Sequence, residues 1–251
     1  MPYSHPQKID RQTLFRQVRH LLPGALLLTA NAGFINAVVL GFFRTPVSHM
    51  TGAISHLGLD LANNRERDAL ASGSIVLGFL GGAVLAGMIV GAVKLVPGRR
   101  FGVAMMIEGA LLGAATAFFI FKLRYGLPLV ALACGLQNAM SSSYCGLVIR
   151  TTHVTGLVTD IGVLLGHWIR HRQVDRWKLR FFVMVFLAFG LGGLVGALAD
   201  RWLGPWSLAL PATGMSLAGG IFWFVTHRRL VDLMQEALPT TAPQTGMFPR
   251  L

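Results

Sequence analysis

The sequence has few charged residues and few cysteines, and each shortage excludes a class of protein. Only 13% of the 251 residues are charged, whereas soluble globular domains carry about 25%. The two cysteines, Cys134 and Cys145, lie eleven positions apart in one expected helix. That spacing is about 16 Å along a helix axis, too far for a disulfide bond between them. No zinc-ligand spacing is present either, so the sequence predicts neither a disulfide scaffold nor a zinc module.

The sequence also lacks the short motifs of common enzymes. His-Glu-x-x-His, Gly-x-Ser-x-Gly and the phosphate-binding Gly-Lys motif are all missing. We therefore expect a protein that is not an enzyme and that has no cofactor and no resident metal. A net charge of +12 would favour nucleic acid as the partner of a soluble protein. Here the basic residues lie between apolar runs, which is typical of the cytoplasmic loops of a membrane protein, so no nucleic acid is expected.

Apolar residues and glycine are abundant instead. Hydrophobic residues make up 53% of the chain, 30 residues are Gly, and the mean hydropathy is +0.59. Each of six apolar runs is near the ~20 residues that a helix needs to cross about 30 Å of hydrocarbon. This pattern predicts an all-α polytopic membrane protein whose first partner is the lipid bilayer. The six runs are residues 21–43, 69–93, 101–121, 127–149, 181–198 and 208–225.

One short segment occurs twice and organises the chain. The segment from Ser48 to Gly58 returns as the segment from Thr152 to Gly162, with His, Thr and both Gly in register. We interpret the two copies as parts of two membrane repeats, residues 21–122 and 126–226, each built as span, half-helix, span, span. Three full crossings are an odd number, so the second repeat would be inverted relative to the first. An amphipathic segment at 1–20 and a tail at 227–251 would flank the repeats on the cytoplasmic side.

The segment after the first span predicts a half-helix. Pro46 ends that span, and His49 to Ala62 would form a helix of about 21 Å, which is short for a full crossing. We therefore expect six crossings and two re-entrant half-helices. The positive-inside rule places sixteen of the 22 Lys and Arg residues inside, whether the half-helices re-enter or cross. Charge thus predicts cytoplasmic termini and leaves six or eight crossings open.

The duplicated polar residues are the candidate binding site. Two half-helix N-termini that point toward the membrane midplane would bring unpaired N–H groups to one place, which favours an anion. Histidines there could carry a coupled proton. In the alternative interpretation, the histidines and amides only satisfy backbone groups and hold helices together; transition-metal binding is a weaker one, because no short metal spacing exists. The predicted substrate-binding residues are Ser48, His49, Thr51, Gly52, Thr152, His153, Thr155, Gly156, Asn36, Gln137 and Asn138.

Four further ionisable residues at membrane depth are candidates for coupling. Such groups are costly in a bilayer and usually line a pathway or pair with each other. His56 and Asp160 occupy equivalent positions in the two copies and could form an ion pair, with Asp60 as a further carboxylate. Glu108 is not duplicated, so it is either a coupling carboxylate or an interfacial residue near a helix start.

The motifs resemble a known family. Gly33-Phe34-Ile35-Asn36-Ala37 with Ser48-His49-Met50-Thr51-Gly52, and Gln137-Asn138-Ala139 with Thr152-His153-Val154-Thr155-Gly156, are similar to segments of the YoaK-type bacterial membrane proteins. The resemblance implies a small protein of the bacterial cytoplasmic (inner) membrane and supplies no substrate. The pair of half-helices is also similar in architecture to the core of carriers built from inverted repeats.

These observations together predict a small secondary transporter. Its substrate would be a small anion or polar metabolite, with or without a coupled proton. Six crossings provide little bulk for a scaffold, so a homodimer is an open option. The alternatives are a channel, or a membrane protein that binds lipid or a partner without transport.

Overall fold

The computed structural model describes residues 11–90, 98–142, 152–172 and 174–237, and within these ranges every element is helical. This agrees with the all-α class expected from the sequence. The elements, in chain order, are α1 (Arg11–Phe43), α2 (Met50–Ala62), α3 (Glu66–Val90), α4 (Arg99–Ile120), α5 (Gly126–Ser142), α6 (Val154–His171), α7 (Arg176–Leu203), the short 3-10 helix η1 (Gly204–Leu208) and α8 (Ala209–Ala237).

Local sequence explains where the two short helices begin and end. His49 precedes α2 in an extended conformation (φ −110°, ψ 90°). Asn64 adopts a left-handed conformation (φ 56°), which asparagine tolerates better than most residues, and reverses the chain into α3. Arg172 (φ 55°) takes the same role after α6. The carboxylate of Asp175 then caps α7 by accepting a 3.2 Å hydrogen bond from the backbone N–H of Lys178.

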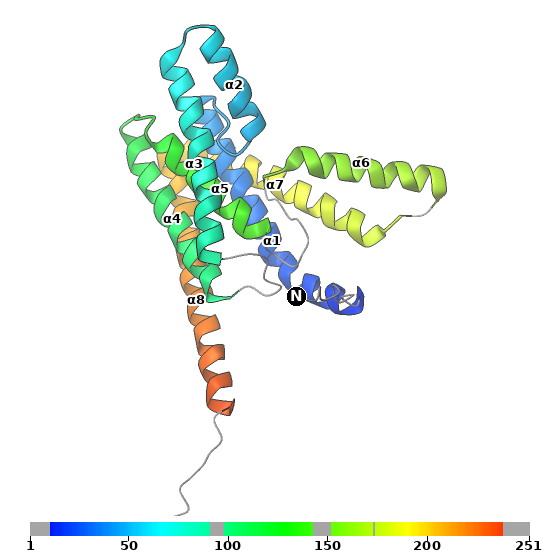
Figure 1. The fold of residues 1–251 in the computed structure, drawn as a ribbon. Helices are drawn as coiled ribbons and strands as arrows, with labels where there is room; N and C mark the ends of the chain where they lie inside the picture. Colours follow the sequence, from blue (N-terminus) through cyan, green and yellow to red (C-terminus); the bar gives the residue numbers. More distant parts are fainter. Residues whose placement is uncertain (1–10, 91–97, 143–151, 173, 238–251) are drawn as a thin grey trace, which may run out of the picture.

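The long helices pair across the two halves of the chain. α1 packs along α7, α3 along α5, and α4 along α8 (Figure 1). α2 folds back on α3 and α6 folds back on α7, and the α6–α7 hairpin projects to one side of the bundle in Figure 1. The first four α-helices correspond in order to the last four, so α1 corresponds to α5, α3 to α7 and α4 to α8. Under this correspondence the α1–α7 pair is equivalent to the α5–α3 pair, and the α4–α8 pair is equivalent to itself.

Glycines let the paired helices approach to backbone contact. A Cβ atom at Gly82 in α3 would collide with the backbone carbonyl of Leu132 in α5. In the α1–α7 pair, a Cβ atom at Gly192 would collide in the same way with the carbonyl of Ala30. Small residues at such crossings are typical of helices that pack in membranes, where close backbone approach replaces the hydrophobic effect. The many glycines of the sequence are therefore packing residues at these points.

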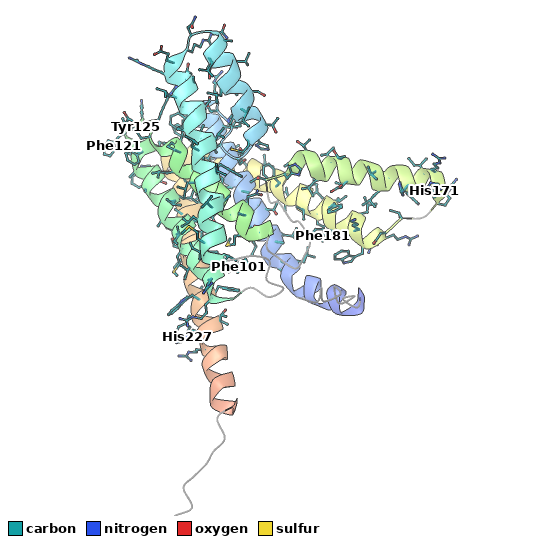
Figure 2. All side chains as sticks on the ribbon, viewed as in Figure 1. Phe101, Phe121, Tyr125, His171, Phe181 and His227 are labelled. Atoms are coloured by element: carbon teal, nitrogen blue, oxygen red, sulfur yellow. The ribbon has the colours of Figure 1, made fainter. Side chains whose placement is uncertain are left out.

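Four segments are long and apolar enough to cross a membrane: Leu22–Phe43, Glu66–Val90, Arg99–Ile120 and Arg176–Arg228, the last of which contains α7, η1 and most of α8. All six expected apolar runs lie on helices, apart from Phe121, which caps the end of α4, and residues 91–93 and 143–149, which are outside the described ranges. In Figure 2, Phe101 and Phe121 mark the two ends of α4, and exposed Tyr125 lies beside Phe121. A tyrosine at a bundle end suits the interface between hydrocarbon and headgroups.

Candidate functional site

The start of each short helix is tied to the span that precedes it. Ser48 Oγ donates a 2.8 Å hydrogen bond to Asn36 Oδ1 in α1. Thr152 Oγ1 donates a 3.1 Å bond to Asn138 Oδ1 in α5. All four side chains were expected at a binding site, and the structure places them in two equivalent tethers. Because Ser48, Thr152 and Asn36 are buried, these bonds satisfy polar groups that water does not reach.

The two duplicated histidines lie next to the tethers and differ in their surroundings. His49 is partly buried, 3.3 Å from Ser48 Oγ through Nδ1, and its ring meets the ring of Phe189 in α7 edge to face at 6.0 Å. His153 is exposed, and its ring covers the first turn of its own helix, where a Cβ atom on Gly156 would collide with it. In α2 the equivalent Gly52 faces Pro46 instead. Each glycine therefore makes room for a ring.

The structure does not bring the two short helices together. α2 and α6 share no close contact in the described part of the chain, and each packs on the long helix that follows it. Thr51 and Thr155 are exposed at the separate helix starts. His56 and Asp160 are exposed as well, and the ion pair expected between them does not form in the described ranges. The pair fails because its partners lie on hairpins that do not meet.

Asp60 is a structural residue of the α2–α3 hairpin. Its side chain is buried, and Ser72 Oγ in α3 donates a 3.4 Å hydrogen bond to its Oδ2. The hairpin lies at the end of the bundle in Figure 1. Asp60 therefore joins α2 to α3.

A second polar cluster lies between α1, α4 and α5, at the depth of the apolar spans. Asn31 Nδ2 donates hydrogen bonds to Glu108 Oε1 at 3.1 Å and to Gln137 Oε1 at 2.9 Å. Gln137 Nε2 in turn donates to the backbone carbonyl of Leu28. Glu108 is fully buried, and its second oxygen, Oε2, has no hydrogen-bond partner in the structure. The structure thus joins two of the predicted site residues, Glu108 and Gln137, through Asn31.

Asn31 was missing from the residues proposed from the sequence because it is not duplicated. Residue 133, its counterpart in the second copy of the Asn-Ala motif, is Ala. A general rule could have identified Asn31 from the sequence. An amide in the middle of an apolar span needs hydrogen-bond partners, and polar groups in neighbouring spans are the candidates.

A cavity of 770 Å³ lies against Asn31, and this volume is in the range of pockets that hold drug-sized ligands. α1, α4, α7 and α8 supply its walls, and of the described residues that line it, Asn31 alone has an amide or ionisable side chain. Leu27, Leu191 and Leu210 form part of its rim and are more than half exposed. The lining residues are Gly24, Leu27, Leu28, Ala30, Asn31, Phe34, Met105, Leu191, Gly192, Val195, Leu210, Pro211, Gly214, Met215, Ala218 and Phe222.

No group of three His, Cys, Asp or Glu side chains gathers in metal-binding geometry among the described residues. The cluster around Asn31 brings together two amides and the carboxyl of Glu108. Such a set can orient a ligand by hydrogen bonds and can hold one positive charge or one proton.

The long apolar helices, the glycine crossings and the polar cluster define a helical protein of membranes with a cavity that opens on its apolar outer surface. The chain belongs to the family DUF1275, described as a protein family of unknown function, whose family model matches residues 24–221. The matched range includes both tethers, the polar cluster and nearly all of the cavity wall. No curated protein and no solved structure matches the chain.

Proposed function

We propose that the protein is a small secondary transporter of the bacterial inner membrane. The observation that carries the proposal is the 770 Å³ cavity whose wall includes Asn31, the residue that hydrogen-bonds the buried side chains of Glu108 and Gln137. A buried carboxyl in a bilayer is costly, and groups of this kind mark substrate and ion pathways in membrane proteins.

The proposed architecture is a pair of inverted repeats with six crossings and two half-helices, α2 and α6. Its support is the exchange relation between the helix pairs α1–α7 and α5–α3, together with the equivalent tethers of Ser48 and Thr152. Inverted repeats commonly place a substrate near the midplane, between the repeats. The lining of the cavity supports a site between the repeats, because α1 and α4 come from the first half of the chain and α7 and α8 from the second.

The cavity favours a substrate with an apolar body and one polar group. Among the described residues, no Lys, Arg or His lines it, and the carboxyl of Glu108 accepts a hydrogen bond from Asn31 at its wall. The anion expected from the sequence requires the starts of α2 and α6 to form one site, and these helices share no close contact in the described ranges. Geometry therefore supports the cavity better than the paired helix starts as the binding site.

The distribution of Lys and Arg supports cytoplasmic termini, and the resemblance to YoaK-type proteins supports the inner membrane. The α2–α3 turn tests the number of crossings. With re-entrant half-helices, a cysteine at Asn64→Cys would be outside the cell and would react with a membrane-impermeant maleimide in intact cells. Reaction only after cell lysis would mean that α2 crosses fully and that the chain has eight crossings.

Transport itself is tested by uptake into proteoliposomes of a labelled panel of amphipathic amines, carboxylic acids and neutral metabolites. Ala218 lines the cavity, and its neighbour Leu217 is exposed and does not. We expect Ala218→Trp to abolish uptake of the transported member by filling the cavity, and Leu217→Trp to keep it. Equal loss in both variants, or no flux of any member, would contradict the proposal. Flux far above carrier rates would identify a channel instead.

Lipid binding without transport is the second candidate, and the exposed apolar rim of the cavity favours it. In that case the panel would show no flux, and a lipid would remain with the purified protein. Ala218→Trp would then displace that lipid, whereas Leu217→Trp would not.

A further inference from the structure

The hydrogen bonds of the polar cluster fix the orientation of the Asn31 amide. Gln137 donates from Nε2 to the carbonyl of Leu28, so the amide oxygen of Gln137 must face Asn31. The carboxyl oxygen of Glu108 also faces Asn31. Both neighbours present acceptors, so the NH2 group of Asn31 must point toward them. The Gln137 contact decides the orientation, because a flipped Asn31 amide would set its oxygen against the Gln137 oxygen.

This orientation leaves one polar atom for the cavity. Both N–H groups of the Asn31 amide are used, and Oδ1 is therefore the atom that the amide can present to the space it lines. An amide oxygen accepts hydrogen bonds and carries partial negative charge. It would attract a donor or a cation and repel an anion.

Glu108 adds a charge behind this oxygen. Met105, one turn before Glu108 in α4, lines the cavity, and the Asn31 amide lies between the cavity and the carboxyl. Oε2 of Glu108 is buried without a hydrogen-bond partner, so an ionised carboxyl would lack compensation there. The membrane-depth parts of α1, α3, α5, α8 and η1, which pack around the cluster and α4, contribute one titratable side chain among the described residues, the thiol of Cys134 in α5. A positive group on a ligand is the missing partner.

The cavity rim indicates how such a ligand would arrive. Leu27, Leu191 and Leu210 are exposed by 72%, 61% and 52% on the apolar outer surface. A ligand with an apolar body would reach the cavity from the hydrocarbon region of the bilayer, without crossing a polar vestibule.

We propose that the cavity binds a lipophilic organic cation, which places its apolar body between α1, α7 and α8 and its positive charge at Asn31 Oδ1, beside Glu108. The inference rests on the proposed function and names its substrate class: amines or onium ions with an apolar body. Protons would compete with the cation for Glu108, because the site can hold one positive charge and has no second carboxyl. Exchange of one cation for one proton at this carboxyl would couple the transport of the cation to the transport of the proton.

Two probes of nearly identical shape and opposite charge test the proposal directly. Binding of tetraphenylphosphonium and of tetraphenylborate to the full-length protein in detergent is measured by equilibrium dialysis. We expect tetraphenylphosphonium to bind the wild-type protein, and tetraphenylborate to bind at least tenfold more weakly. Glu108→Gln keeps the shape and removes the charge, and it should weaken tetraphenylphosphonium binding by about 10- to 100-fold. Glu66→Gln, at the exposed start of α3, is the matched control and should leave binding unchanged.

Wild-type protein supplies a measurement that does not depend on the folding of a variant. Tetraphenylphosphonium binding should weaken as the pH falls, because protons fill Glu108, and binding in weak buffer should release protons. Equal affinity for the two probes, a Glu108→Gln variant that folds and keeps wild-type affinity, or pH-independent binding would each overturn the inference. Selective binding of the cation without flux in proteoliposomes would keep the inference and refute transport. Flux of a neutral or anionic panel member without cation binding would keep transport and refute the inference.

Discussion

The glycine crossing between α3 and α5 gives a sharp test of the packing, because its neighbour in sequence is an ideal control. Gly82 is buried, and a Cβ atom there would collide with the Leu132 carbonyl. Gly81 is exposed, and a Cβ atom there would meet nothing within 4 Å. Alanine at either position gains about 1 kcal/mol of helix propensity over glycine. The propensity terms cancel when the two variants are compared, so the difference between them reports the collision alone.

The collision sets the expected size of that difference. The obstructing atom is backbone, so the helices themselves must separate, and overpacking of this kind costs about 1–3 kcal/mol. For a chain of this size, 1 kcal/mol shifts Tm by about 2–4 °C. We expect Gly82→Ala to unfold about 2–12 °C below Gly81→Ala. The assay is thermal unfolding in a mild detergent, followed by the loss of the monodisperse peak in size-exclusion chromatography.

The same comparison in the other half strengthens the test. Gly192 faces the Ala30 carbonyl, whereas Gly190 is exposed with nothing near its Cβ position. We expect Gly192→Ala to fall below Gly190→Ala by a similar interval. Equal Tm values within both pairs would refute the backbone-contact packing of α3 with α5 and of α1 with α7.

Two further predictions concern buried polar and sulfur groups. Ser48→Ala removes the donor to the buried Asn36 side chain, which should cost about 1–3 kcal/mol of stability and lower Tm by several degrees. The control is Ser55→Ala, whose hydroxyl is exposed and bonds only within its own helix, and its stability should stay within about 0.5 kcal/mol of wild type. Equal losses in the two variants would show that the tether contributes nothing to stability. Cys134 is buried, so in a Cys145→Ala background the folded protein should resist a maleimide and react only after denaturation; rapid labelling of folded protein would place Cys134 at an accessible surface.

The helices could be predicted from the sequence because their signal is local. Length and hydropathy alone place six runs on helices, and α2 at Met50–Ala62 agrees closely with the expected half-helix. α6 runs from Val154 to His171 and is longer than its counterpart α2. Its extra turns could not be predicted from the repeat, since the two copies diverge after Gly162.

The pairing of helices and the centre of the candidate site depend on contacts between distant residues. The duplicated motif correctly singled out Asn36 and Asn138 as important polar residues, but it gave no indication that each would bond the start of its own short helix. Asn31 has no duplicate, and only its contacts with Glu108 and Gln137 show its place in the cluster. Duplication therefore reveals what the two halves share, while the cavity depends on residues in which they differ.

The pairing of α1 with α7 has a consequence for how the protein is made. α1 enters the membrane first, yet the helix against which it packs is synthesised almost last, with α3 already committed to α5. Until α7 arrives, the glycine-bearing face of α1 is open to lipid and to other nascent chains. During synthesis, an insertase or a lipid must therefore shield α1 until α7 has been inserted. A chain truncated before α7 should be recognised and degraded by membrane quality-control proteases.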